Sequence, residues 1–255
     1  MTIRASQRRQ LAESLVAASS TRAALVPFSE EIAELSLADA YRIQFETLRL
    51  RRRAGERRAG WKIGFEPDIR TPIAGYLLAS TVWIDGADLS RERFIAPGLE
   101  ATIGIVLARD LSGPGVTVTD VAAATGGVVA ALEVVDARFR DRKCPLADAV
   151  ADNAFAAGVV LGGALHPLGA LDLRLEGVTV ELNGRLVATA AGAAALGHPL
   201  AAVAWLARML AGAGLGLKAG DLVLTGGLAG IREAQVGDTA RGAFTRLGAV
   251  TARFV

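Results

Sequence analysis

The spacing of hydrophobic residues changes once along this 255-residue chain, near Gly60. Before this point apolar residues recur at helical spacing, and after it short alternating runs are separated by Gly and Pro. A chain that forms helices first and strands afterwards is typical of the α+β class rather than of a repeated strand–helix–strand array. We therefore predict a single domain over residues 1–255, with a helical N-terminal subdomain at 1–59 and a β-rich core at 60–255.

The composition excludes several classes of protein. Hydrophobic residues make up 52% of the chain, which argues against intrinsic disorder. The single cysteine, Cys144, excludes a disulfide framework within the chain, and with only two histidines it also excludes Cys₄ and Cys₂His₂ zinc sites. No run of about 18 uncharged apolar residues occurs. With a net charge of +2 and no nucleic-acid motif, these features predict a cytoplasmic protein with no membrane and no nucleic-acid partner.

Local patterns predict individual helices and strands. A helix is expected to begin at Ser36, where Asp39 completes a capping box, and Asn183-Gly184 predicts a type I′ hairpin over 178–189. Another helix is expected after His198, with Pro199 at its first position. The remaining expectations are strands at 60–64, 100–107, 158–161, 221–225, 239–244 and 249–254, helices from 119 or 120 and over 145–156, a loop at 72–78, and a helix or strand at 128–135.

Polar residues inside apolar segments are the strongest functional signals, because a buried charge is costly unless it is paired or binds a ligand. Lys62 lies between Trp61 and Ile63, and Glu133 interrupts an apolar run. Glu100 begins an alternating strand in which Thr102 projects from the same face. Two carboxylates and a hydroxyl are oxygen ligands that suit a hard cation such as Mg²⁺. Separate structural salt bridges explain the same residues, so the spacing alone leaves both interpretations open.

Segments spread in order along the whole chain carry a family resemblance: GWKIG at 60–64, PIAGYLL at 72–78, LEVVDAR at 132–138, ADN at 151–153, VLG at 160–162, GHPL at 197–200, AWL at 204–206, AGD at 219–221, VGD at 236–238 and LG at 247–248. They resemble the 2-oxopent-4-enoate hydratase and 4-oxalocrotonate decarboxylase family, which is related to the fumarylacetoacetate hydrolases. The resemblance implies a β-rich mixed roll behind an N-terminal helical portion, one catalytic domain, and a homo-oligomer.

The resemblance also implies a Mg²⁺ or Mn²⁺ cofactor, held by a Glu-x-Glu pair and a third Glu. The metal would chelate the 1-carboxylate and 2-oxo oxygen of a small acidic 2-oxo acid and stabilise its enolate. Glu100 and Glu133 match the first and third ligands, and Thr102 stands at the second as a weak or water-mediated ligand. Lys62 and Glu133 are the expected catalytic residues. The expected substrate-binding residues are Lys62, Gly226, Gly227 and Leu78.

The sequence departs from the family pattern at three places. Thr102 is neutral where the family has a carboxylate, which predicts weaker binding of a hard cation. Ile73 replaces an aspartate that often follows the proline at this point. The segment 63–71 is shorter than the family's loop, which covers the active site. Near Glu133, we expect Asp136 and Arg138 to pair with each other and orient the glutamate.

These observations favour a lyase that acts on a 2-oxo or 2-hydroxydienoate acid, with a hydratase of the 2-hydroxypentadienoate type as the first hypothesis. A decarboxylase of the 4-oxalocrotonate type is the second, since both reactions share the enolate. The departures keep two further alternatives open: a metal-independent elimination, isomerisation or cyclisation in a biosynthetic pathway, and a non-catalytic partner subunit.

Overall fold

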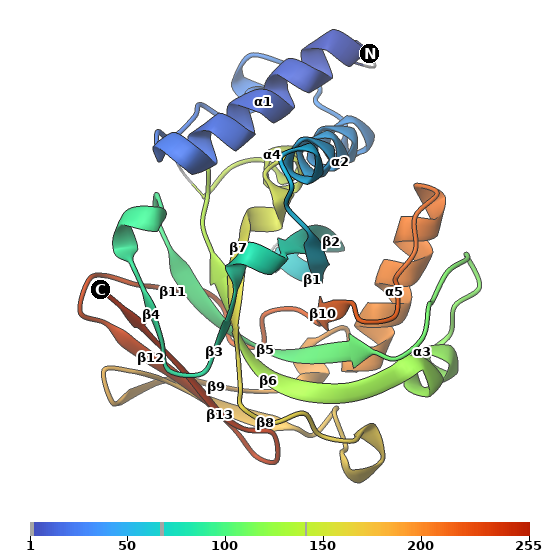
Figure 1. Cartoon of the computed structure of the whole chain (residues 1–255), viewed down its shortest axis with the longest axis vertical. Helices are drawn as coiled ribbons and strands as arrows, with labels where there is room; N and C mark the ends of the chain where they lie inside the picture. Colours follow the sequence, from blue (N-terminus) through green and yellow to red (C-terminus); the bar gives the residue numbers. More distant parts are fainter. Residues whose placement is uncertain (1–2, 67–68, 141) are drawn as a thin grey trace.

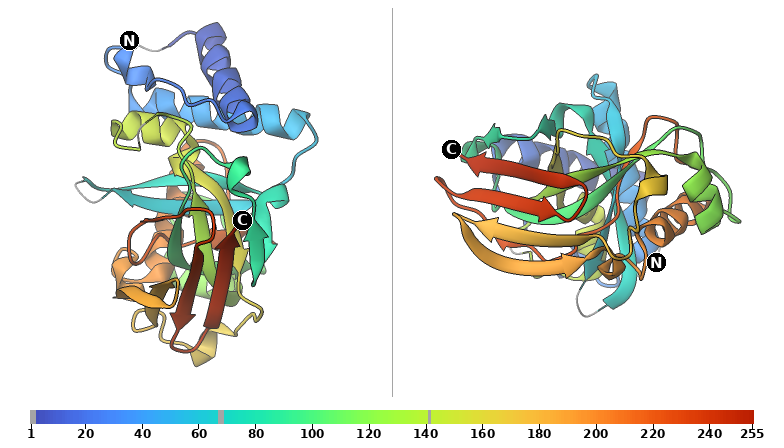
Figure 2. Two further views of the ribbon diagram at one scale, coloured as in Figure 1. Left: turned by 90° about the vertical axis from the view of Figure 1, so that its left-hand side faces the viewer. Right: turned by 90° about the horizontal axis from the view of Figure 1, so that it is seen from below.

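Helices lie at one end of the molecule and two β-sheets at the other (Figures 1 and 2). The computed structural model describes residues 3–66, 69–140 and 142–255. The helical end is built from α1 (Ala5–Thr21) and α2 (Leu37–Arg53), which contact each other, and from α4 (Leu146–Ala151), which packs against α2. The order predicted from the sequence, helices first and then a β-rich core, is confirmed.

Helix α2 begins where the sequence predicts. The Ser36 hydroxyl accepts a hydrogen bond from the backbone N–H of Asp39 at 3.1 Å and donates one to the Asp39 carboxylate at 2.9 Å. Three arginines occupy the last turn, where a positive charge is favourable beside the unpaired carbonyls. Gln44, in the middle of α2, donates to the carbonyls of Ala74 and Val150, both at 2.8 Å. This buried amide attaches the helices to the first sheet.

The larger sheet has the strand order β2-β1-β10-β5-β6-β7-β3, with β11 pairing to β5. It rolls up, so that β2 and β7 lie next to each other although no strand ladder joins them. Asn153 bridges this seam: it accepts from Tyr76 N–H at 2.7 Å and donates to the Tyr76 carbonyl at 2.9 Å. The strands are β1 (Arg58–Glu66), β2 (Ile69–Leu78), β3 (Val82–Ile84), β5 (Gly98–Leu107), β6 (Thr125–Val135), β7 (Ala156–Leu161), β10 (Leu222–Leu224) and β11 (Arg232–Glu233).

The smaller sheet has the order β4-β13-β12-β8-β9 and packs on the outer face of the roll. Its strands are β4 (Ala87–Leu89), β8 (Gly177–Leu182), β9 (Arg185–Ala191), β12 (Thr239–Phe244) and β13 (Gly248–Phe254). Asn183 and Gly184 both have positive φ, 53° and 74°, which confirms the type I′ hairpin. The alternation of β5 places Ile103 and Ile105 in the core between these layers.

Helix α5 (Pro199–Gly212) closes the opposite side of the core, beside α3 (Val118–Ala124). The imidazole of His198 accepts from Leu200 N–H at 3.1 Å and so caps α5. By length and composition alone, the segment Gly192–Gly212 is apolar enough to cross a membrane. Half of it is buried inside the protein, and residues such as Leu206 and Leu210 belong to the core.

Two expectations from the sequence are wrong. Residues 72–78 form part of β2 rather than a loop; Pro72 is tolerated there because β2 is an edge strand of its sheet, so no second ladder needs its missing N–H. The helix expected over 145–156 ends at Ala151, because Asn153, Ala154 and Phe155 all have positive φ. The undecided stretch 128–135 is strand β6.

Candidate active site

A buried ion pair crosses the interior of the rolled sheet. Lys62 comes from β1 and Glu133 from β6, two strands that β10 and β5 separate in the sheet order. The Lys62 Nζ lies 2.8 Å from Glu133 Oε1, and the two side chains are 4% and 0% exposed. Because the sheet rolls up, side chains on its concave face meet across it, which brings together residues from two distant parts of the sequence.

The Glu133 carboxylate is only partly satisfied. Its Oε2 atom is buried and makes no hydrogen bond with any residue that the structure describes. Burial raises the pKa of Glu133, and the positive charge and hydrogen bond of Lys62 offset part of that rise. A buried carboxylate with an unused oxygen is unfavourable for folding alone. It is the type of group that a ligand or a cation completes.

Glu100 is the direct cross-strand neighbour of Glu133. The two residues are register partners in the β5–β6 ladder, so their side chains leave the same face of the sheet. The carboxylate of Glu100 lies against Gly227, where an added Cβ would be only 2.4 Å from Glu100 Oε2. A glycine at 227 is therefore what leaves room for this carboxylate.

Thr102 lies on the same face, next to the two glutamates, and is completely buried. Its hydroxyl donates to the Gly226 carbonyl at 2.8 Å, which ties the loop after β10 to β5. Gly226 has a φ of +114°, and an added Cβ there would lie 2.1 Å from the Phe65 ring. Gly226 and Gly227 thus allow the loop after β10 to pass between Glu100 and Phe65. This loop lies at the end of the roll that contains Lys62 and Glu133.

Two carboxylates and one hydroxyl are the oxygen donors at this centre. No group of three His, Cys, Asp or Glu side chains with metal-ligand geometry occurs among the described residues, here or elsewhere. The arrangement still suits a divalent cation that takes few ligands from the protein. Glu133 Oε2 has no hydrogen-bond partner among the described residues, and Gly227 leaves space beside Glu100. Water and substrate oxygens would fill the remaining positions, as hard cations permit.

The structure brings most of the expected site residues together, namely Lys62, Glu100, Thr102, Glu133, Gly226 and Gly227. It does not bring Leu78 to them. Leu77 belongs to the apolar cluster on the concave face, with Leu224 and Ala131, whereas Leu78 packs against the core on the other face. Both leucines also line a separate cavity. Ile73 pairs with Gly64 in the ladder, and its side chain lies close to the position that a Cβ on Gly64 would occupy, near Lys62 Nζ.

The expected pair between Asp136 and Arg138 is wrong. Asp136 accepts hydrogen bonds from the backbone N–H groups of Ile95 and Ala96, at 3.0 and 2.6 Å. Arg138 forms its ion pair with Asp152, which also accepts from the Arg138 N–H at 2.8 Å. The sequence favoured the local partner, but the turn after β6 directs the arginine toward the end of α4.

Sequence reasoning missed Phe65, whose ring packs at the Gly226 position, and Gly64, which lies beside Lys62 Nζ. The only signal for Gly64 is its place two residues after Lys62 on the same strand face. Phe65 carries no local signal, because its contact depends on how β1 and the loop after β10 meet in space.

The comparisons with known proteins agree with this architecture. Residues 52–255 match the fumarylacetoacetate (FAA) hydrolase C-terminal family. The chain is 38% identical over 229 residues to 4-oxalocrotonate decarboxylase of Pseudomonas putida, covering 87% of each chain. It is 40% identical over 209 residues to 2-hydroxypent-2,4-dienoate hydratase of Pseudomonas putida, covering 79% of this chain and 94% of the hydratase.

A solved structure extends the likeness to the whole fold. The 4-oxalocrotonate decarboxylase from Pseudomonas putida G7, complexed with magnesium and adipate, has a TM-score of 0.96 and 35% identity, and the match covers 100% of this chain and 99% of that one. These relatives are lyases of two kinds, hydratases and decarboxylases. The matched length, the shared fold and the motifs at 60–64 and 132–138 together show that this chain belongs to the fumarylacetoacetate hydrolase family, within its hydratase and decarboxylase branch.

Proposed function

We propose that this protein is a lyase that hydrates a 2-hydroxypenta-2,4-dienoate-type acid. The observation that carries the proposal is the Lys62–Glu133 pair inside the roll, with Glu100 as its strand neighbour. A buried ammonium held 2.8 Å from a carboxylate with an unused oxygen is an arrangement suited to binding a small acid. The hydratases at up to 40% identity support the choice of reaction.

Lys62 has two tasks in this proposal. Its ammonium orients the substrate carboxylate. The same group exchanges a proton with a carbon atom of the enolate during the reaction. Glu133 supplies the counter-charge that a buried ammonium needs in an apolar interior. The surrounding apolar side chains, such as Leu224 and Ala131, exclude bulk water and so strengthen both interactions.

A divalent cation, held by Glu100 and Glu133 with Thr102 beside them, would supply the positive charge that stabilises the enolate oxygen. The related decarboxylase structure is complexed with magnesium, which supports a divalent ion here as well. We expect weaker binding than a site of three carboxylates gives, because affinity for hard cations follows ligand charge. Comparison of turnover with Mg²⁺ and with Mn²⁺ identifies which ion the site uses.

The test is a turnover assay on freshly generated 2-hydroxypenta-2,4-dienoate and on 4-oxalocrotonate, with Mg²⁺, with Mn²⁺ and with EDTA, and products read by mass. Gain of one water by the dienoate, only with metal, is the expected result. No turnover of either substrate by a folded protein would overturn the proposal, and would transfer support to the alternatives of a different, metal-independent reaction or a partner subunit.

Decarboxylation is the second candidate, and one observation favours it. The fold superimposes on 4-oxalocrotonate decarboxylase over its whole length, with a TM-score of 0.96. In the same assay, loss of carbon dioxide from 4-oxalocrotonate without hydration of the dienoate would select this reaction.

We further propose that the protein is cytoplasmic and forms a homo-oligomer. The single, non-disulfide cysteine supports the location, and the family resemblance supports the assembly. Sedimentation of the purified protein tests its assembly.

A further inference from the structure

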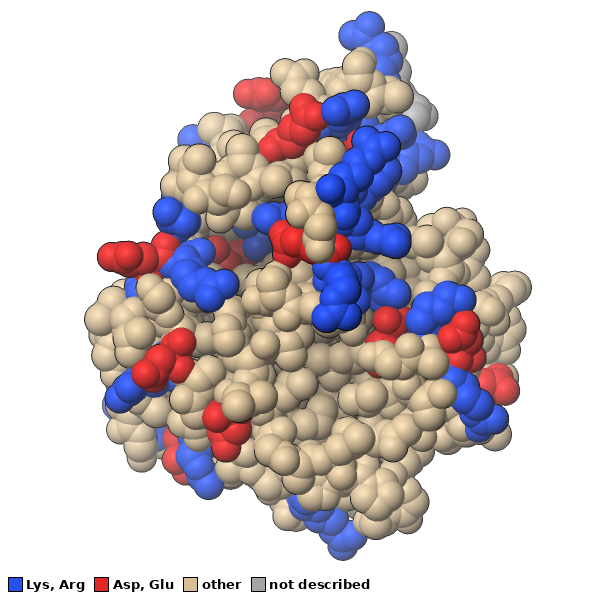
Figure 3. Space-filling model, in the orientation of Figure 1, with Lys and Arg blue, Asp and Glu red and all other residues tan. Residues whose placement is uncertain are grey.

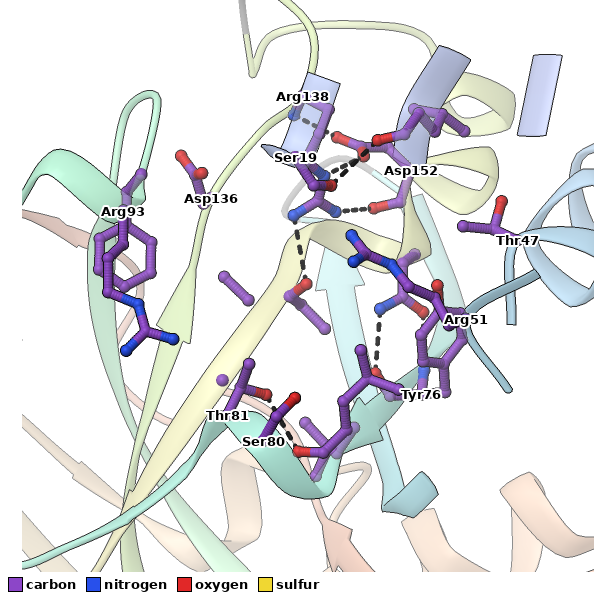
Figure 4. Close-up of a pocket in the computed structure, with 18 of the residues that line it drawn as sticks. Ser19, Thr47, Arg51, Tyr76, Ser80, Thr81, Arg93, Asp136, Arg138 and Asp152 are labelled. Atoms are coloured by element: carbon purple, nitrogen blue, oxygen red, sulfur yellow. Dashed lines mark hydrogen bonds and ion pairs between the residues drawn. The ribbon is translucent and has the colours of Figure 1, made fainter. Parts of the chain in front are cut away.

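One cavity in the described part of the chain lies apart from the Lys62–Glu133 centre. It has a volume of about 480 Å³ and lies where α1, α2 and the β2–β7 seam meet (Figure 4). Neither Lys62, Glu133, Glu100 nor the Gly226–Gly227 loop lines it. The volume lies within the range of pockets that take small organic ligands. The proposed function gives this cavity no task.

Four arginines and three acids line the cavity, and the acids are already engaged. Asp136 accepts from two backbone N–H groups, Asp152 is held by Arg138, and Glu56 accepts from Ser80 and Arg51. Two of the arginines, Arg22 and Arg93, have no acidic partner among the described residues. The cavity therefore has an excess of unneutralised positive charge. Figure 3 shows basic side chains gathered over this part of the molecule.

The positive groups occupy opposite walls of the cavity. Arg93 lies on one side, stacked on the Trp83 ring with its Cζ 5.3 Å from the ring centroid. Arg51 lies on the other side, near Tyr76, as Figure 4 shows. Stacking holds the Arg93 guanidinium in one plane and leaves its N–H groups for a ligand. Arg51 uses one N–H on Glu56, at 3.1 Å, and has others to donate.

Tyr76 adds a neutral donor beside Arg51. The side chain is only 5% exposed, and its hydroxyl makes no hydrogen bond with any described residue. Burial raises the pKa of Tyr76 to about 12, so the hydroxyl keeps its proton at neutral pH. It can therefore donate a hydrogen bond to a ligand carboxylate. A hydroxyl on a cavity wall that makes no hydrogen bond with a described residue is available to donate to a ligand oxygen.

We propose that this cavity is a second ligand site, which takes a small dicarboxylate with one carboxylate on Arg93 and the other on Arg51 and Tyr76. A small diacid has two charged ends separated by a short apolar body, and Leu77 and Ala156 give the cavity apolar lining besides the two arginines. This inference is independent of the proposed function, because it requires neither turnover nor a cation in the roll.

The test is calorimetric titration of the purified protein with adipate in the presence of EDTA, compared with hexanoate, which has the same chain length and one carboxylate. We expect adipate to bind about tenfold more tightly than hexanoate, because only the diacid uses both arginines. Arg93→Gln and Arg51→Gln should each weaken adipate binding by about tenfold. The matched control is Arg174→Gln, an exposed arginine that does not line the cavity.

Three outcomes overturn the proposal: no adipate binding by the folded protein, equal binding of adipate and hexanoate, or adipate binding that survives Arg93→Gln unchanged. Because Arg93 is exposed, its substitution leaves the core intact, and thermal unfolding of the variant verifies this. Tyr76→Phe supplies a second readout: it removes one hydroxyl and should weaken adipate binding severalfold without altering hexanoate binding relative to wild type.

Discussion

Two buried ion pairs lie on either side of the turn that follows β6, and they differ in how completely they are satisfied. Arg138 and Asp152 form a closed network: the carboxylate accepts from both the backbone and the side chain of Arg138, whose guanidinium also donates to the Ala156 carbonyl at 3.2 Å. Lys62 and Glu133 make one contact, at 2.8 Å, and leave Glu133 Oε2 without a hydrogen bond among the described residues.

We expect this difference to separate a structural pair from one that takes part in the proposed function. A buried pair whose other polar groups are all hydrogen-bonded fixes two segments in one arrangement, here the end of β6 and the end of α4. A buried pair with an unused oxygen adds little to stability and retains the ability to bind a ligand. Burial alone, which is nearly complete in both pairs, does not distinguish them.

The largest expected effect concerns the unsatisfied pair. Glu133→Gln keeps the size of the side chain but removes its charge, so both the counter-ion of Lys62 and one cation ligand are lost. We expect kcat/KM to fall by about 10³-fold or more, with the circular dichroism spectrum unchanged. In Asp152→Asn, which alters the other pair, kcat/KM should change by less than about tenfold. Equal losses in the two variants would remove the distinction.

A large effect on stability is expected for the satisfied pair. Arg138→Met leaves the buried Asp152 without its partner, and we expect the free energy of unfolding to fall by about 3–5 kcal/mol in urea titrations. The control is Arg140→Met, which breaks an exposed pair with Glu30 and should change the free energy by about 1 kcal/mol at most. A loss in Arg138→Met no larger than in the control would show that the network is not structural.

A smaller effect is expected at the neutral position beside Glu133. Thr102→Glu adds a third carboxylate to the face that holds Glu100, and we expect Mg²⁺ affinity to rise about tenfold by calorimetry. Thr102→Gln has the same length without the charge, so it controls for the loss of the hydrogen bond to Gly226. If both variants bind Mg²⁺ as the wild type does, the cation does not lie at this face.

The smallest effect is a pH dependence of stability. Burial, only partly offset by Arg138, raises the pKa of Asp152 from 3.8 to about 6. Between these values the folded protein holds a proton that the unfolded chain has released, so this group's contribution to stability falls as the pH rises through that window. The difference in unfolding free energy between wild type and Asp152→Asn should therefore decrease from pH 4 to pH 6. A difference that increases with pH would mean that Arg138 dominates over burial.

Local sequence patterns predicted the elements that depend on neighbouring residues. The helix start at Ser36 and the Asn183-Gly184 hairpin appear in the structure as expected. The Asp39 carboxylate accepts from the Ser36 hydroxyl, whereas a full capping box has it accept from the backbone N–H. Each of these two elements is fixed by contacts within a few residues, so a single sequence contains the necessary information. The family resemblance is confirmed over residues 52–255. It also grouped Lys62, Glu100 and Glu133, and the structure places Lys62 against Glu133 with Glu100 as the cross-strand neighbour of Glu133.

Only the tertiary structure decided which of these residues touch. Because the sheet rolls up, Lys62 forms an ion pair with Glu133, and the two do not have separate partners. The turn after β6 directs Arg138 to an ion pair with Asp152 instead of Asp136. The edge position of β2 makes a strand of a segment that Pro72 marks locally as a loop. In each case the arrangement is stabilised by pairing and burial between segments that are distant in the sequence. Local sequence patterns do not predict those contacts.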